Sequence, residues 1–240
     1  DLPYVDSPEQ TRALVAATFE TTTNPTFSAS LDAWARSMAT RLRKLGLGDI
    51  ADPDLIASCW PLHPLALLVL PDLCHRYGQN ERSLFSFLAG PDPRAVPAWL
   101  QRHLLDQNNP LPTVLLDAVY DFFIQSATSM AGASIAANRW LEIDTRIRDA
   151  HGLSAAQRRV IRTVGLLNLV SAGGSLRASK DLVCWVAADG NEGTSDERAV
   201  ARRLRELDEA GLLTFRDFAD EYRVWQGSDF DIRSAVESAR

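Results

Sequence analysis

Apolar residues recur at steps of three and four over much of the first 150 residues, which is the spacing of one face of an α-helix. A clear example is the stripe Leu31, Trp34, Met38, Leu42 and Leu45. Helix start signals such as Asp52-Pro53-Asp54 precede the apolar stripes, and glycines follow several of them. No alternation typical of a strand lies between them. The pattern predicts that residues 1–150 are entirely helical.

The pattern changes after residue 151. Capping signals at Ser154, Ser179 and Thr194 each predict a helix start. A glycine ends the third of these helices, and two short strand-like runs follow at 212–216 and 222–225. Three helices followed by a two-stranded hairpin is the element order of a winged helix. The sequence therefore predicts a mainly α protein, with a helical bundle over 1–150 and a winged-helix domain with a small β-hairpin over 151–240.

The composition is that of a soluble globular protein, with 46% hydrophobic and 23% charged residues among 240. No run approaches the roughly eighteen uncharged apolar residues that a membrane span needs, and no signal peptide is recognised. The sequence has three scattered cysteines, at Cys59, Cys74 and Cys184. An odd number without regular spacing is typical of reduced thiols in the cytoplasm. The first residue is Asp1 and not methionine, so we expect the sequence to be part of a longer chain.

The net charge of −6 excludes a polycation that binds nucleic acid through its bulk charge. The first 150 residues carry 12 Lys and Arg against 17 Asp and Glu, and residues 151–240 carry 13 against 14. Any contact with nucleic acid must therefore come from a local cluster of cations.

No catalytic motif is present in the sequence. A phosphate-binding P-loop, an H-E-x-x-H helix, paired C-x-x-C motifs and a nucleophile elbow are all missing. Cys59 and His63 are four residues apart, and Cys74 adjoins His75. A zinc site built from them would need two helices to converge, and buried thiols beside a helix-start histidine are the simpler interpretation. The sequence therefore predicts no catalytic residue and no metal ligand in this chain.

A polar, charged segment opens the helix expected at 81–89, and it places Arg82 in the first turn. A cation is disfavoured there by the helix dipole. A guanidinium is always charged and matches the geometry of phosphate oxygens, so Arg82 is a candidate for contact with a phosphate. The alternative is a surface ion pair with Asp72 or Glu81, and for Arg82 alone the two interpretations carry equal weight.

The run Gly78-Gln79-Asn80-Glu81-Arg82-Ser83-Leu84-Phe85-Ser86-Phe87-Leu88, preceded by His63-Pro64-Leu65, resembles a signature in large bacterial P-loop ATPases, including those of phage-defence systems such as BREX. It is also similar to the lid of origin-recognition-type AAA+ ATPases, in which an arginine called sensor 2 contacts the γ-phosphate. The resemblance covers about residues 50–90. One residue is inserted between Gly78 and Arg82 relative to that lid.

The resemblance implies that the chain is the lid and winged-helix region of an AAA+/STAND-like ATPase. Arg82 would then be the sensor-2 residue, and His63 and Pro64 would lie near the nucleotide base. Gln79 and Asn80 belong to the same candidate nucleotide-binding segment. ATP would be shared with an upstream P-loop domain of the same protein.

A second candidate site is the third helix of the winged-helix region. Arg198, Arg202 and Arg205 share one face of this helix, and Lys180 and Arg223 could add phosphate contacts. Acidic residues on the same helix would repel phosphate; they are Asp196, Glu197, Glu206, Asp208 and Glu209. A solvated face and a protein contact therefore remain open beside DNA, and a protein contact or weak DNA binding is favoured over specific operator binding.

The function expected from these observations is regulatory. The chain would couple the nucleotide state of a bacterial, cytoplasmic ATPase to domain movement, and through it to a partner protein or DNA, with phage defence as one setting. The alternative interpretations are a stand-alone winged-helix transcription regulator with a helical sensor domain, and a purely structural interaction module.

Overall fold

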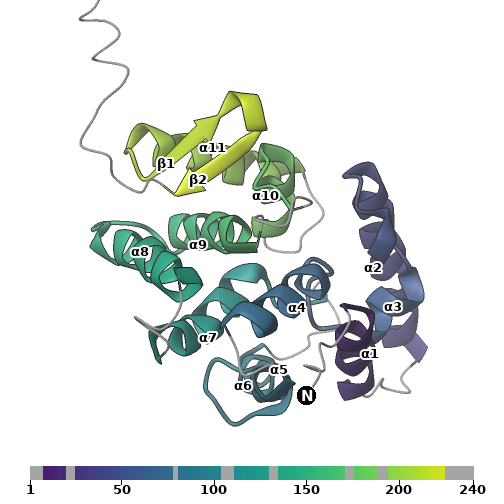
Figure 1. The fold of residues 1–240 in the computed structure, drawn as a ribbon. Coiled ribbons are helices and arrows are strands. Elements are labelled where there is room, and N and C mark those ends of the chain that lie inside the picture. The colour runs from purple at the N-terminus through teal and green to yellow at the C-terminus, as the bar shows by residue number, and fades with distance from the viewer. Residues whose placement is uncertain are drawn as a thin grey trace, which may run out of the picture.

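The computed structural model describes residues 8–19, 25–77, 81–103, 111–129, 135–170, 176–188 and 194–224. This part of the chain is mainly helical and carries one two-stranded antiparallel sheet near its C-terminal end, as the sequence predicts (Figure 1). The elements of the first 150 residues are α1 (Pro8–Thr18), α2 (Pro25–Lys44), the 3-10 turn η1 (Gly48–Ile50), α3 (Pro53–Ser58), α4 (Ala66–Tyr77), α5 (Glu81–Ala89), α6 (Val96–Arg102), α7 (Leu116–Ser129) and α8 (Ile135–Asp149).

Local signals explain where several of these helices begin and which face they bury. The Asp52 side chain accepts a hydrogen bond from the Asp54 N–H at 3.0 Å, and Pro53 is the first residue of α3. On α2, the predicted apolar stripe is buried at Leu31, Met38 and Leu42. The helix period and the capping residues therefore place these elements correctly.

The segment before α7 is extended and not helical. The Thr113 hydroxyl donates to the Leu111 carbonyl at 3.1 Å, and the helix begins only at Leu116. Val114 instead forms an isolated parallel β-bridge with Leu62. The Val114 N–H donates to the Pro61 carbonyl at 2.7 Å, and the His63 N–H donates to the Val114 carbonyl at 3.0 Å. Two extended segments that are far apart in the sequence thus satisfy each other's backbone groups.

The last part of the described chain has the predicted order of three helices and a hairpin. It consists of α9 (Ala155–Val170), α10 (Lys180–Ala187), α11 (Thr194–Glu209), β1 (Leu213–Arg216), the 3-10 turn η3 (Asp217–Ala219) and β2 (Glu221–Val224). Strands β1 and β2 are antiparallel, with Leu213 opposite Val224. The capping box before α9 is present, since the Gln157 N–H donates to Ser154 Oγ at 3.2 Å and the Ser154 N–H donates to Gln157 Oε1 at 3.0 Å.

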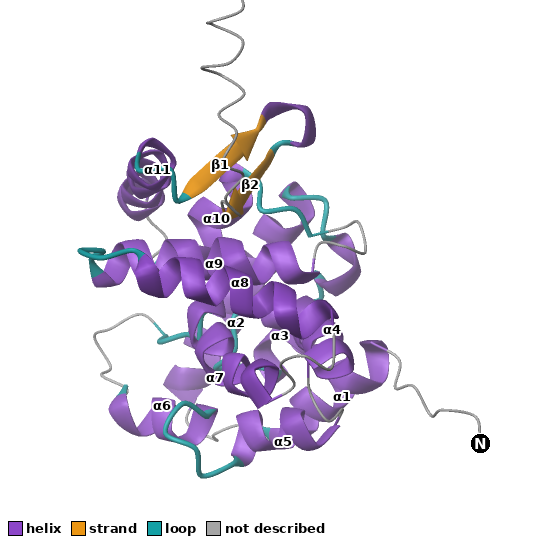
Figure 2. Cartoon of the chain, turned by 60° about the vertical axis from the view of Figure 1, so that its left-hand side comes forward, coloured by secondary structure: helices purple, strands orange, loops and turns teal. Residues whose placement is uncertain are grey.

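Helix α9 lies between the two predicted regions. It contacts α7 and α8 on one side and α10, α11 and β2 on the other (Figures 1 and 2). Every residue from Val160 to Val170 except Arg162 is buried. Gly165 allows the close approach of α8, because a Cβ at this position would lie 2.9 Å from Ile143 Cγ2. The predicted boundary after residue 150 falls in the turn between α8 and α9, yet one hydrophobic core runs across it.

The hairpin and α5 lie at opposite ends of the molecule. In both views the strands are at the top of the picture, α9 crosses the middle, and α5 and α6 are at the bottom (Figures 1 and 2). The two candidate sites predicted from the sequence are therefore well separated in space.

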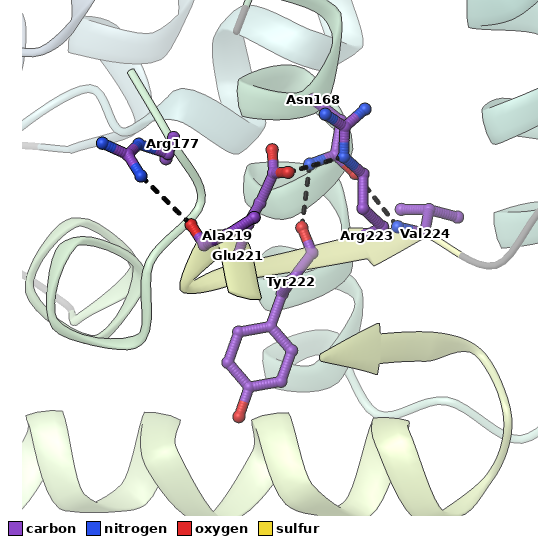
Figure 3. A network of polar contacts seen from close by, with 7 residues as sticks. All are labelled: Asn168, Arg177, Ala219, Glu221, Tyr222, Arg223 and Val224. Atoms are coloured by element: carbon purple, nitrogen blue, oxygen red, sulfur yellow. Dashed lines mark hydrogen bonds and ion pairs between the residues drawn. The ribbon is translucent and has the colours of Figure 1, made fainter. Parts of the chain in front are cut away.

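Strand β2 is fixed to α9 by a buried amide. Asn168 is 2% exposed, its Nδ2 donates to the Tyr222 carbonyl at 2.9 Å, and its Oδ1 accepts from the Val224 N–H at 3.0 Å (Figure 3). In addition, the Tyr222 N–H donates to the Ala178 carbonyl at 2.9 Å. These bonds set the position of the hairpin relative to the three helices.

We predict that Asn168→Ala lowers the free energy of unfolding by about 2–4 kcal/mol, because two buried backbone groups of β2 lose their partner. Denaturant unfolding followed by circular dichroism measures the change. Gln101→Ala, which removes an exposed amide from α6, is the matched control and should change the stability by less than about 0.5 kcal/mol. Equal effects of the two substitutions would contradict the clamping role of Asn168.

Candidate functional site

Arg82 lies in the first turn of α5, and its side chain is exposed. No hydrogen bond or ion pair joins it to a side chain in the described ranges. Asp72, one of the two acidic partners expected for it, is instead 3.7 Å from Arg76 Nη2. Glu81 is the other expected partner, and its side chain lies outside what the structure describes. The guanidinium of Arg82 is therefore open to solvent on the surface of the helical bundle.

Helix α5 is amphipathic, and this decides where Arg82 faces. Leu84, Phe87 and Leu88 are buried in the core of the bundle. The opposite, exposed side carries Arg82, Phe85, Ser86 and Ala89. We call these four residues the α5 face. Its members are three, four and seven residues from Arg82, so they lie along one side of the helix.

His63 and Pro64 are buried, unlike Arg82. The His63 side chain is 3% exposed, its Nδ1 accepts the Leu65 N–H at 3.2 Å, and its ring centroid lies 4.7 Å from that of Trp185 in an edge-on contact. Burial lowers the pKa of His63 from its ordinary 6.5 to about 3. The neutral ring therefore joins the start of α4 to α10, and its burial argues against direct contact with a nucleotide base. Gln79 and Asn80 lie outside the described residues.

The arginine face of α11 is present as predicted. Arg198, Arg202 and Arg205 are exposed. Val200, Leu204 and Leu207 are buried on the opposite side. Acidic residues accompany the arginines, since Arg202 Nε is 3.8 Å from Glu206 Oε1 on the next turn. The face is thus a mixed-charge surface and not a purely basic one.

The first turns of α11 are held by an element from the other predicted region. Arg41 on α2 donates from Nη2 to Glu197 Oε2 at 2.9 Å, although the residues are 156 positions apart. The N-terminal part of α11 is the part that a winged helix would place in a major groove. Here an acidic residue and the end of α2 occupy that position, which weighs against deep insertion into DNA.

Lys180 and Arg223 differ in how much of the side chain is exposed for contact with a partner. Lys180, the first residue of α10, is exposed. Arg223 is only partly exposed, and its Nε donates to the buried carboxylate of Glu221 at 2.8 Å (Figure 3). Arg223 therefore serves the internal charge balance of β2, and Lys180 is the better candidate for a surface contact.

The three cysteines lie in the hydrophobic core. Burial raises the pKa of Cys59 to about 11, of Cys74 to about 12 and of Cys184 to about 11, so their thiols are protonated at neutral pH. Within the described ranges no three His, Cys, Asp or Glu side chains gather as a metal site would require. The described helices also include none with the length and apolar character needed to cross a bilayer.

Sequence reasoning missed the polar contacts that join distant helices. Arg162 on α9 donates to Asp121 on α7 at 2.9 Å, and Arg159 on α9 is 3.5 Å from Asp117 on α7. The sequence analysis also did not single out Phe85, which is exposed on the α5 face. Its spacing of three residues from Arg82 indicates that the two share one side of the helix. Nothing in the local spacing indicates the partners of Arg159 and Arg162.

Comparisons with known protein families, with curated proteins and with solved structures gave no match to this chain.

We predict that the buried His63 makes the protein sensitive to acid. Its pKa is about 3 when folded and 6.5 in the unfolded chain, so the unfolded state binds the proton first as the pH falls. The contribution of neutral His63 to the free energy of unfolding is fully present above about pH 6.5. It decreases as the pH falls towards 3, by up to about 1.4 kcal/mol per pH unit.

His63→Asn is the matched variant, because the amide oxygen can still accept the Leu65 N–H but does not titrate. Denaturant unfolding between pH 4 and 7.5 should show a shallower loss of stability for the variant. Burial raises the pKa of Asp117 and Asp121, but both carboxyls titrate in both proteins, so the difference isolates His63. Parallel curves for the two proteins would refute the assignment.

Proposed function

We propose that this chain is the lid-like and winged-helix portion of a P-loop ATPase, and that Arg82 contacts a phosphate of ATP held by the nucleotide-binding domain. The observation that supports the proposal is the exposed Arg82 in the first turn of α5, with no ion pair to any described side chain. A buried or fully paired Arg82 would have been incompatible with it. The proposal depends on Arg82 and not on His63 or Pro64, which the core buries.

The chemistry of a guanidinium fits this role. It keeps its positive charge at any physiological pH and presents several N–H donors in one plane, so it can bind two phosphate oxygens together. ATP would offer Arg82 its γ-phosphate, which ADP lacks. The affinity of the lid-like region for the nucleotide-holding domain would therefore depend on whether that phosphate is present.

The continuous core supplies the means to transmit this difference. Because α9 is buried against both the bundle and the winged-helix elements, a movement of α5 would carry α11 and the hairpin with it. Nucleotide binding at one end would then reposition a partner-contact surface at the other. The resemblance to phage-defence ATPases supports a bacterial, cytoplasmic setting for this proposal.

In the protein that joins this chain to its nucleotide-binding domain, we predict that Arg82→Gln reduces the preference for a non-hydrolysable ATP analogue over ADP by about tenfold or more. One charge-assisted contact to the terminal phosphate is lost. Calorimetric titration of both nucleotides measures the ratio. Arg158→Gln, which changes another exposed arginine, on α9, is the control. An unchanged ratio in Arg82→Gln would exclude the phosphate contact.

A stand-alone DNA-binding regulator is the second candidate function. The observation that favours it is the row of exposed arginines Arg198, Arg202 and Arg205 on α11. The neighbouring carboxylates and the Arg41–Glu197 contact weigh against tight or deep binding. A surface that mixes charges in this way favours a protein partner.

If α11 nevertheless binds duplex DNA, the salt dependence will show it. Arg202→Ala and Arg205→Ala should each flatten the slope of log affinity against log salt by about one unit, because each removes one phosphate contact. Arg158→Ala should leave the slope unchanged. Fluorescence anisotropy with a labelled duplex at several salt concentrations is the measurement, and weak binding that none of these variants alters would leave the protein-contact interpretation in place.

A further inference from the structure

The exposed side of α11 carries its charges in an ordered pattern. Four charged residues on this side are separated by steps that keep them on one face of the helix; they are Arg202, Arg205, Glu206 and Glu209. We call these four residues the α11 stripe. All four side chains are exposed. The N-terminal half of the α11 stripe is basic, and its C-terminal half is acidic.

Reversing the direction of the helix exchanges the two signs of charge along the α11 stripe. Arg205 and Glu206 flank its midpoint, and Arg202 and Glu209 lie equally far from that midpoint. Each arginine thus has a glutamate at the mirrored position. A second α11 that ran antiparallel to the first would lay its acidic half against the basic half of the first. A parallel copy would set arginine against arginine.

We propose that the α11 stripe is the contact surface for a second copy of this chain, in an antiparallel pair of α11 helices related by a two-fold axis. Such an interface needs a patch that is complementary to itself, because the same residues face one another in both directions. In this pair Arg202 of each copy faces Glu209 of the other. The inference names a partner for the α11 surface, and it does not depend on the contact between Arg82 and a phosphate.

The residues beside the α11 stripe fit the same arrangement. Arg203 and Asp208 are mirrored about the midpoint and differ in sign, and Ala201 and Ala210 are mirrored as well. The Ala210 N–H donates to the Glu206 carbonyl at 3.0 Å, so the helical geometry extends to the last mirrored residue. Ala201 is partly exposed and Ala210 is exposed. Their short side chains leave room at both ends of the stripe for a second helix.

Contacts within the chain leave the α11 stripe available. Glu197, which pairs with Arg41 of α2, lies more than one turn before the stripe. Arg202 Nε is 3.8 Å from Glu206 Oε1, and the two side chains are 67% and 44% exposed. Gln157 Nε2 donates to Glu206 Oε2 at 3.1 Å, also at an exposed position. Exposed contacts of this kind contribute little to stability, so the stripe can exchange them for contacts with a second helix.

Charge complementarity selects a second copy over other occupants. Duplex DNA would bring its phosphates against Glu206 and Glu209, and these like charges repel. A protein surface of a single sign would satisfy only half of the α11 stripe. A fitting partner carries both signs in reversed order over the same length, and another copy of α11 does so because its sequence is identical. Charged pairs of this kind set the orientation of paired helices.

The experiment exchanges one mirrored pair of charges within the chain. Sedimentation equilibrium is measured for the full-length protein, for Arg202→Glu, for Glu209→Arg and for the double variant that carries both substitutions. Arg36→Glu, which changes an exposed arginine on α2, is the matched control. Thermal unfolding followed by circular dichroism shows whether each variant is folded.

We expect the unsubstituted protein to dimerise below about 0.5 mM, and more weakly as the salt concentration rises. Each single substitution should weaken the dimer by about tenfold or more, because the two-fold axis repeats every like-charge contact. The double variant should return to within about threefold of the unsubstituted protein, since opposite charges face each other again. Arg36→Glu should dimerise as the unsubstituted protein does.

Three results would overturn the proposal. One is an unsubstituted protein that stays monomeric at about 0.5 mM. Another is a dimer that the single substitutions do not weaken, or that the double variant does not restore. The third is a monomer that binds labelled duplex DNA through Arg202, which would assign the α11 stripe to DNA. The test of Arg82 measures nucleotide affinity, so either proposal can fail while the other stands.

Discussion

The burial of α9 on almost every side is the constraint on which the rest of the structure depends. A helix that is apolar around most of its circumference must be covered on all of those sides. The bundle covers one side through α7 and α8, and the winged-helix elements cover the other. Gly165 sets the closest approach, and Asn168 satisfies the backbone of β2 from within the same helix. Separating the two regions would expose this apolar helix to water, so the described part of the chain is expected to move as one body.

Because of this shared core, the relative position of the two candidate surfaces is fixed. The α5 face and the arginine face of α11 lie at opposite ends of one packed unit (Figures 1 and 2). Under the proposed function, a displacement at one end would reach the other through this continuous core. Ion pairs on the rim of the core, such as Arg162–Asp121, add geometric definition and little net stability because they are partly exposed.

Electrostatics distinguishes the two surfaces. On α11 acidic residues flank the arginines in the sequence, Arg202 lies 3.8 Å from Glu206, and Glu197 is bound by Arg41 from α2. On the α5 face the guanidinium has no described partner and an exposed ring beside it. The charges on α11 are close to balanced, whereas the charge of Arg82 has no described counter-charge beside it. Water solvates the exposed guanidinium of Arg82, and an anion becomes necessary only where a partner surface covers it.

The sequence by itself determined the local structure. The helices, the caps at Asp52, Ser154 and Ser179, and the order of three helices and a hairpin follow from periodicity and from bonds between residues close in the chain. The exposure of Arg82 was also consistent with its place on an amphipathic helix. Only the tertiary structure decided the packing of His63 against Trp185, the bridge between Leu62 and Val114, and the ion pair between Arg41 and Glu197. Those contacts join residues separated by about fifty to 156 positions, and local spacing carries no information about which distant side chains the collapse of the core brings together.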